Sequence, residues 1–177
     1  MKKTIDAFDY AGHICKAMKK GILLTTKAGE NVNTMTIGWG KIGIEWNRPV
    51  FIAYVRETRY TKQLLEESGE FTVNIPYGDV DPKILSYCGT KSGRDYDKCK
   101  ETGLTPSFDA DAPYFEEAEL VIVCKKLYAQ DMDKACVIDS AVNTNYGENE
   151  PMHRVYVGEI VKALIKEAVT NLSSFSN

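Results

Sequence analysis

The chain has 177 residues, of which 44% are hydrophobic and 27% are charged, a length and composition that predict one globular domain spanning residues 1–177. The formal net charge of -3 does not supply the basic field that nucleic-acid binding usually needs, so no nucleic-acid partner is expected. No apolar run is long enough for a membrane span or a signal peptide, and the five scattered cysteines indicate free thiols. We therefore expect a cytoplasmic protein without a membrane partner or a metal site.

Strand signals dominate the first third of the chain. A run of apolar and threonine residues from Gly21 to Thr26 precedes a turn, and an extended stretch follows from Val32 to Trp46. Pro49 then precedes an apolar run from Val50 to Val55, which has the length and composition of a buried strand.

Short helices and further strands follow in an irregular order. We expect a helix from Thr61 to Ser68, a strand from Phe71 to Ile75, a helix that Asp81 caps and that runs from Pro82 to about Cys88, a short helix from Asp95 to Glu101, strands from Glu119 to Ala129 and from His153 to Ile165, and a helix or packed loop from Asp133 to Val142. This order differs from the regular alternation of a parallel sheet, and no glycine-rich nucleotide loop is present. The predicted fold is mainly β, an antiparallel barrel with short helices on its outside.

The stretch from Asn33 to Gly40 combines a bulky face with a small one, because successive side chains of a strand point to opposite sides. One face carries Asn33, Met35, Ile37 and Trp39, and the other carries Thr34, Thr36, Gly38 and Gly40. A flat heterocycle can lie against such a backbone, since glycine has no Cβ to hold it away, and the backbone amides can then bond its polar edge. The alternative interpretation is a barrel strand with glycine where the strand bends.

Cationic and hydroxyl side chains gather where a strand gives way to a helix. Arg56 and Arg59 precede the helix that Thr61 begins, and the first N–H groups of a helix carry partial positive charge. A phosphate at this position would meet amides, a guanidinium and a hydroxyl together. The alternative is that Thr61, or Thr58, simply caps the helix while the arginines are solvated.

Three further residues are candidates for ligand contacts. Lys98 ends a flexible loop from Ser92 that either closes over a ligand or is a charged surface loop. His153 opens a predicted strand, where it either donates a proton or a hydrogen bond near a redox ring or has a structural role. Phe175 lies in a tail of the kind that usually frays, unless the tail folds back and places the aromatic ring over a flat ligand.

Taken together, these segments resemble the flavin-reductase-like, FMN-binding split-barrel family, and within it the flavoredoxin-type members. Each motif is short, but the motifs occur in the family's order from about Gly21 to Ile165. They are Asn33-Thr34-Met35-Thr36 with Trp39, Pro49-Val50-Phe51, Arg59-Tyr60-Thr61, Phe71-Thr72-Val73-Asn74, Ser92-Gly93-Arg94-Asp95 with Asp97-Lys98, and Val157-Gly158-Glu159-Ile160.

The resemblance implies an FMN-binding, antiparallel Greek-key split barrel that works as a homodimer, with the flavin near the subunit interface. It implies an isoalloxazine held by Asn33, Thr34, Met35, Thr36, Ile37 and Gly38, with Trp39 near the ring, and a phosphate held by Arg56, Arg59, Thr61 and Lys98. It also implies that His153 lies near the nicotinamide or the flavin edge. Residues 148–152, however, differ from the acidic Gly-Asp-His context of many flavin reductases.

Three functions are compatible with these expectations. In the favoured one, bound FMN accepts hydride from NADH or NADPH and passes electrons onward, so the protein is an NAD(P)H-dependent flavin reductase that positions its cofactor. In the second, FMN stays bound as an electron carrier between partner proteins, without NAD(P)H turnover, as flavoredoxin-like proteins imply. In the third, a pyridoxamine-phosphate-oxidase-type barrel binds another ligand or has lost its flavin.

Overall fold

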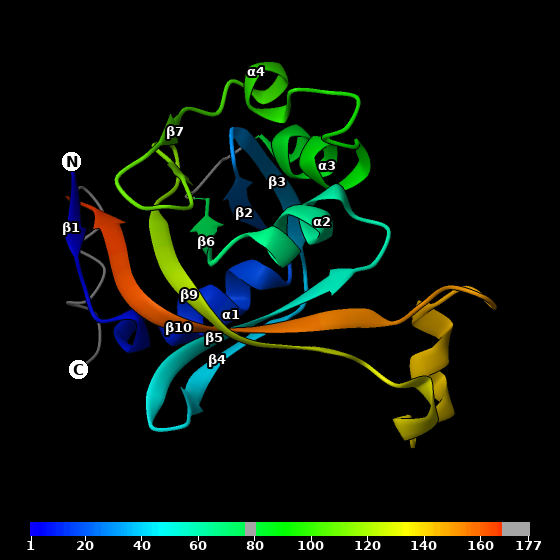
Figure 1. Ribbon diagram of the computed structural model, residues 1–177. Coiled ribbons are helices and arrows are strands. Elements are labelled where there is room, and N and C mark those ends of the chain that lie inside the picture. The colour runs from blue at the N-terminus through cyan, green and yellow to red at the C-terminus, as the bar shows by residue number, and fades with distance from the viewer. Residues whose placement is uncertain (77–80, 168–177) are drawn as a thin grey trace.

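A computed structural model describes residues 1–76 and 81–167 of the chain, so the predicted contact of Phe175 lies outside the described residues (Figure 1). The strands are β1 (Lys2–Thr4), β2 (Ile22–Ala28), β3 (Asn31–Ile37), β4 (Gly40–Glu45), β5 (Arg48–Arg56), β6 (Glu70–Ile75), β7 (Pro106–Ser107), β8 (Tyr114–Phe115), β9 (Leu120–Asp131) and β10 (His153–Lys166). The helices are α1 (Ala11–Met18), α2 (Tyr60–Glu67), α3 (Pro82–Thr90) and α4 (Lys98–Thr102), with the 3-10 turns η1 (Ala7–Tyr10), η2 (Lys134–Cys136) and η3 (Ser140–Asn145).

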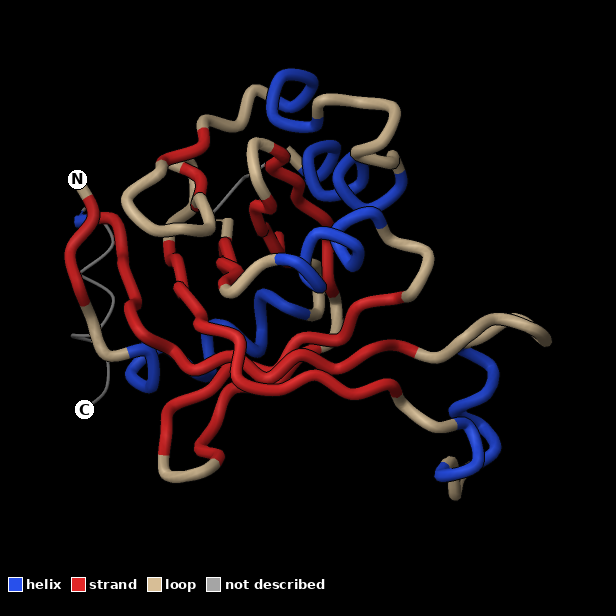
Figure 2. The backbone as a smooth tube through the Cα atoms, in the orientation of Figure 1, coloured by secondary structure: helices blue, strands red, loops and turns tan. Residues whose placement is uncertain are grey.

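One antiparallel sheet forms the body of the protein. Its strands are ordered β3-β2-β6-β9-β10-β5-β4, and β1 pairs with the far end of β10. No hydrogen-bonded ladder joins the edge strands β3 and β4 in the described part of the chain, so the sheet curves around its core without closing. Figure 2 shows the curved strands in red with the short helices around them. The predicted fold class, mainly β with an antiparallel split barrel, is confirmed.

The extended stretch predicted from Val32 to Trp46 is two strands, because the chain leaves the sheet at Gly38 and Trp39. Gly40, which starts β4, fits there only without a side chain, since a Cβ would lie 2.9 Å from Cζ of Phe51 and 3.0 Å from Sδ of Met18. This close approach lets helix α1 pack against the hairpin formed by β4 and β5.

Helix α1 is an element that the sequence pattern did not reveal. It is only eight residues long, contains Gly12, and its N-cap residue Tyr10 makes no side-chain capping bond. Only Ile14 and Met18 are buried, and they join the apolar core around Leu24 and Phe51. A segment with so short an apolar stripe gives little periodic signal. None of the helices within residues 1–76 and 81–167 has the length and apolar character that crossing a membrane requires.

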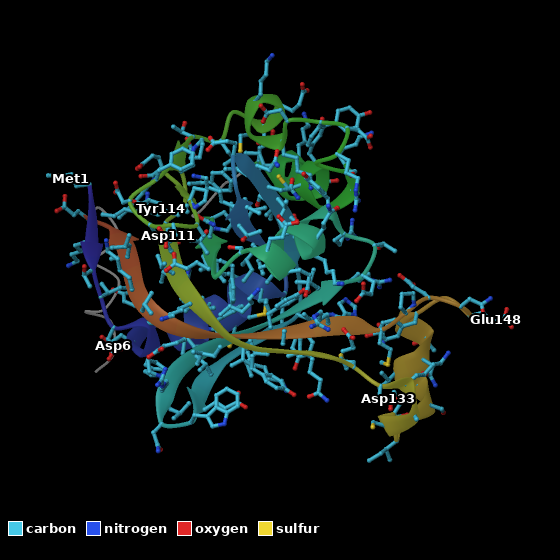
Figure 3. All side chains as sticks on the ribbon, viewed as in Figure 1. Met1, Asp6, Asp111, Tyr114, Asp133 and Glu148 are labelled. Carbon is cyan, nitrogen blue, oxygen red and sulfur yellow. The ribbon has the colours of Figure 1, made fainter. Side chains whose placement is uncertain are left out.

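Strands β9 and β10 run together beyond the body and carry residues 132–152, here called the arm, away from it (Figure 1). In Figure 3 the labels Asp133 and Glu148 mark the arm, far from Tyr114 at the opposite side of the molecule. The segment expected as a helix or packed loop from Asp133 to Val142 forms two 3-10 turns instead. Asp133 and Asp139 each cap one turn by accepting a hydrogen bond from a backbone N–H two residues on.

Gly158 lies where the ladder between β9 and β10 shifts register, and it faces the core. A Cβ here would lie 2.6 Å from Cζ of Phe71 and 2.7 Å from Cβ of Cys124, both fully buried. We expect Gly158→Ala to lower the free energy of unfolding by about 1–3 kcal/mol, because an added methyl group overpacks the core. Urea denaturation measures this difference.

Gly43 provides the matched control, because it also lies in a strand but a Cβ there would meet nothing within 4 Å. Gly43→Ala should change the free energy of unfolding by less than about 1 kcal/mol. Equal stabilities for the two variants would contradict the assignment of close packing at Gly158.

Candidate functional site

A cavity of about 240 Å³ opens where the end of β3, the connection to β4 and the end of β5 meet the start of α2. We call it the strand-end cavity. Its lining residues are Met35, Thr36, Ile37, Gly38, Trp39, Tyr54, Arg56, Arg59 and His153. All of them except Tyr54 are site residues expected from the sequence, although they come from three separate segments of the chain.

The β3 side of the cavity offers backbone groups. Strand β3 is an edge strand that pairs only with β2, so one row of its N–H and C=O groups has no strand partner. Met35 and Ile37 point into the core, with exposed fractions of 4% and 3%, and Thr36 donates its hydroxyl to the carbonyl of Leu85 at 2.6 Å. The β3 surface of the cavity is therefore largely main chain, which suits a flat molecule with a polar edge.

The start of α2 offers positive charge. Arg59 is the N-cap residue of α2, but its side chain makes no capping bond, so the first N–H groups of the helix have no side-chain acceptor. The guanidinium donates through Nη1 to the carbonyl of Gly89 at 2.7 Å, and its buried Nε has no hydrogen-bond partner. A helix start beside an unsatisfied guanidinium nitrogen is an arrangement that binds anions.

Four other predicted contacts lie behind the cavity wall. Thr61 is fully buried and accepts a hydrogen bond from Nδ2 of Asn33 at 2.8 Å. The hydroxyl of Thr34 is bonded within the sheet, to Thr25 and to the carbonyl of Leu24. The ammonium of Lys98 donates to the carbonyls of Thr34 and Cys88, both at 2.8 Å, and burial lowers its pKa. In this structure, the side chains of Asn33, Thr34, Thr61 and Lys98 bond to protein groups and connect the elements around the cavity.

His153 lies on the β10 side of the cavity, beneath Trp39. The centroids of their rings are 4.6 Å apart, and Nδ1 of His153 is 2.8 Å from the hydroxyl of Tyr146. Burial, followed by the charge of Arg56, lowers the pKa of His153 to about 4. The imidazole is therefore neutral near pH 7.

Arg56 is bonded to the loop that precedes β10. It donates to the carboxylate of Glu150 and, through Nη2, to the carbonyl of Asn145 at 3.0 Å. The hydrogen bond from Arg56 lowers the pKa of Glu150. The sequence did not identify Tyr146 and Glu150 as site residues, because they lie in a polar loop without periodicity. The one available signal was that this loop directly precedes His153 in the sequence.

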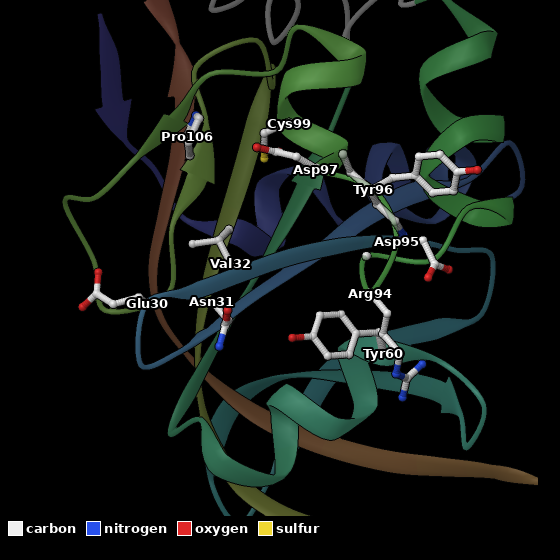
Figure 4. Close-up of a pocket in the computed structure, with 12 residues that line it drawn as sticks. Glu30, Asn31, Val32, Tyr60, Arg94, Asp95, Tyr96, Asp97, Cys99 and Pro106 are labelled. Atoms are coloured by element: carbon white, nitrogen blue, oxygen red, sulfur yellow. The ribbon is translucent and has the colours of Figure 1, made fainter.

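A second cavity, of about 470 Å³, lies on the other side of the junction between β3 and α2 (Figure 4). The loop from Gly93 to Asp97 and the start of α4 form one wall, and Gly93 approaches so closely that a Cβ would lie 2.0 Å from Oδ1 of Asn33. Arg94 lies over the ring of Tyr60, 5.0 Å from its centroid. The acidic residues Glu30, Asp95 and Asp97 share this lining, so the second cavity is less suited to an anion than the strand-end cavity.

Within residues 1–76 and 81–167, no group of three or more histidine, cysteine or acidic side chains is arranged to hold a metal ion. The chemistry that the strand-end cavity offers is the binding of a flat polar ring on β3 and an anionic group at the start of α2.

Comparison with known proteins gives a family match and similar solved structures. The family model described as "Flavin reductase like domain" matches residues 17–173. Flavoredoxin from Methanosarcina acetivorans is 25% identical, with a TM-score of 0.65, over 83% of this chain and 68% of that chain. Flavoredoxin of Desulfovibrio vulgaris (Miyazaki F) is 25% identical, with a TM-score of 0.65, over 84% of this chain and 70% of that chain.

The fold extends to more distant proteins. An FMN-binding domain of a flavin reductases-like enzyme from Shewanella baltica OS155 is 15% identical, with a TM-score of 0.68, over 99% of this chain and 83% of that chain. Since the family model spans most of the sequence, the chain belongs to the flavin reductase-like domain family.

Proposed function

We propose that the protein binds FMN in the strand-end cavity and is an NAD(P)H-dependent flavin reductase. The observation that carries the proposal is the unsatisfied Nε of Arg59 beside the uncapped start of α2, at one end of a cavity whose other end is the free edge of β3. The first feature fits a phosphate, and the second fits the polar edge of an isoalloxazine.

In this assignment the protein holds and orients, and the bound flavin supplies the hydride and electron transfer. The residues from Met35 to Gly38 form the surface for the ring, and Trp39 and His153 border it. Arg59 and the N–H groups at the start of α2 bind the phosphate. Asn33, Thr61 and Lys98 act one layer further out, by fixing β3 against α2 and α3.

Replacing Arg59 tests the phosphate assignment. We expect Arg59→Ala to weaken FMN binding by more than about tenfold, because a charge-assisted hydrogen bond contributes roughly 1.5–3 kcal/mol. Riboflavin, which lacks the phosphate, should bind equally well to the variant and to the unsubstituted protein. Fluorescence titration with both flavins measures the effect.

Lys166→Ala is the control, since Lys166 ends β10 and donates to the carbonyl of Glu117, away from both the cavity and the hairpin of β4 and β5, and it should leave both affinities unchanged. An Arg59→Ala variant that binds FMN with unaltered affinity would reject the assignment. Equal losses for FMN and riboflavin would instead indicate a damaged fold.

Anaerobic mixing with NADH or NADPH tests the reductase activity. Hydride transfer requires a donor carbon within about 3–3.5 Å of the acceptor nitrogen, so a nicotinamide must reach the open face of the cavity. We expect one of the two nucleotides to bleach the visible absorbance of the FMN-bound protein in a stopped-flow experiment. Protein that cannot be reconstituted with FMN would favour a barrel with another ligand.

The electron carrier is the second candidate function, and the resemblance to two flavoredoxins supports it. A carrier should not bleach with either nucleotide but should bleach when a reduced ferredoxin is added. That pair of results would replace the reductase with the carrier.

A homodimer is the proposed assembly. The cavity volume of about 240 Å³ is below the roughly 300–1,000 Å³ usual for small-molecule pockets, so a second surface is needed to enclose the ligand.

Three exposed aromatic side chains mark the surface that a second copy would cover. Trp39, Tyr128 and Trp46 are 42%, 43% and 56% exposed. Tyr128 and Met132 line one hollow, and Met132 and Trp39 line a second hollow next to it. This exposed apolar surface leads from the hairpin of β4 and β5 to the cavity, and a second copy of the chain is its proposed partner.

Light scattering tests the dimer. The unsubstituted protein should have the mass of two chains, and Tyr128→Glu should lower the mass toward that of one chain, because a buried carboxylate is costly. Phe108→Glu is the control, since Phe108 is 58% exposed but lies between β7 and β8, beside Lys27. An FMN-bound monomer in the unsubstituted protein would contradict the proposal.

A further inference from the structure

The hydroxyl of Tyr146 is placed against Nδ1 of His153 by a set of contacts from Arg56. The guanidinium lies over the ring of Tyr146, 5.6 Å from its centroid, and donates to the carbonyl of the preceding Asn145. It also pairs with Glu150, whose other carboxylate oxygen accepts a hydrogen bond from the N–H of Gly147 at 3.1 Å. The loop that carries Tyr146 is thus fixed at both ends, and the 2.8 Å contact to His153 results from this arrangement.

The direction of this hydrogen bond follows from the two groups. The Tyr146 hydroxyl lies 2.8 Å from Nδ1 of His153, and its oxygen accepts a hydrogen bond from the backbone N–H of His153. Burial raises the pKa of Tyr146 by more than this backbone hydrogen bond lowers it, so the hydroxyl keeps its proton. An unprotonated imidazole nitrogen accepts a hydrogen bond more readily than a phenol oxygen does, so the hydroxyl donates to Nδ1. In a neutral imidazole the single ring proton is then on Nε2.

Nε2 is the nitrogen left for a ligand. The His153 ring lines the strand-end cavity, and Nε2 has no protein partner among the described residues. The Trp39 ring packs against the imidazole at an interplanar angle of 41°, which limits how the imidazole can turn. With Nδ1 occupied, Nε2 is the polar atom that His153 can offer to the cavity.

We propose that Tyr146 is a positioning residue that holds His153 in the Nε2–H tautomer, so that His153 presents a neutral hydrogen-bond donor to the heterocycle bound in the strand-end cavity. The identity of that heterocycle rests on the proposed function, whereas the tautomer does not. The charged and titratable groups around His153 are Arg56 from β5, Arg59 at the start of α2, and Tyr146 and Glu150 from the preceding loop.

These groups keep the ring neutral. Burial is the largest effect, and the two arginines act in the same direction, whereas Glu150 opposes them, so the pKa of His153 is about 4. A donor of this kind keeps the same protonation state from about pH 6 to pH 8, since its pKa lies well below that range. His153 then contributes a directed hydrogen bond and does not supply a proton in that range.

Tyr146→Phe tests the proposal, because it removes the hydroxyl and retains the aromatic ring. Nitrogen-15 NMR of the histidine rings in flavin-free protein reports which nitrogen carries the proton, and His153→Gln identifies the signals of His153 by their loss. In the unsubstituted protein at neutral pH we expect the proton on Nε2. In Tyr146→Phe we expect a mixture of tautomers.

The pKa of His153 gives an independent readout with opposite signs for the two bond directions. A hydroxyl that donates to Nδ1 stabilises the neutral ring, so its removal should raise the pKa by about half a unit to one unit. A bond in the other direction would stabilise the charged ring, and its removal would lower the pKa. Tyr96→Phe is the control, since the exposed Tyr96 contacts Tyr87 and Lys91 instead, and it should change neither readout.

The proposal is overturned by a proton on Nδ1 in the unsubstituted protein, by a pKa that falls in Tyr146→Phe, or by a variant that matches the unsubstituted protein in tautomer and pKa. Titration with FMN then tests the ligand contact, where the resonance of the Nε2 proton should shift in the unsubstituted protein. FMN that binds without moving this resonance would overturn the contact. Protein that shows the expected tautomer but never binds FMN would instead reject the proposed function.

Discussion

The buried ammonium of Lys98 is the contact on which the geometry of the site depends. It donates to the carbonyl of Thr34 on β3 and to the carbonyl of Cys88 on α3, while its own backbone begins α4. A buried charge is costly unless it is hydrogen-bonded, and an edge strand has carbonyls to offer. The same bonds therefore satisfy the charge, occupy part of the free edge of β3 and fix two helices against it.

The position of the strand-end cavity follows from that arrangement. Arg59 at the start of α2 bonds to the carbonyl of Gly89 in α3, and Thr61 in α2 bonds to Asn33 in β3. These bonds fix the start of α2 against β3 and α3, and the chain leaves the sheet beyond the end of β3, at Gly38. A region with free main-chain groups thus borders a region of positive charge, and the proposed ligand needs both.

Much of this arrangement could be predicted from the sequence. The apolar runs predict the strands β2, β5, β6, β9 and β10, because a buried strand needs apolar residues at neighbouring positions of the sequence. The lining from Met35 to Trp39 and the two arginines could also be identified, because strand ends and helix starts have local signatures. The hydrogen-bond partners that hold the site together could not be predicted. The bond from Lys98 to Thr34, for example, spans 64 positions and has no local pattern in the sequence. Tyr146 was missed for the same reason, because a loop without periodicity becomes part of the site only through tertiary contacts.

The central place of β10 has a consequence for how the chain folds. This strand pairs with β9, β5 and β1, so the hairpin of β4 and β5 has no neighbour in the sheet until β10 arrives. A ribosome releases β4 and β5 about a hundred residues before β10, and pairings between such distant segments are slow to form. We therefore expect the nascent chain to expose the unpaired backbone edge of β5 during synthesis, and such an edge can pair with other chains and aggregate until β10 covers it.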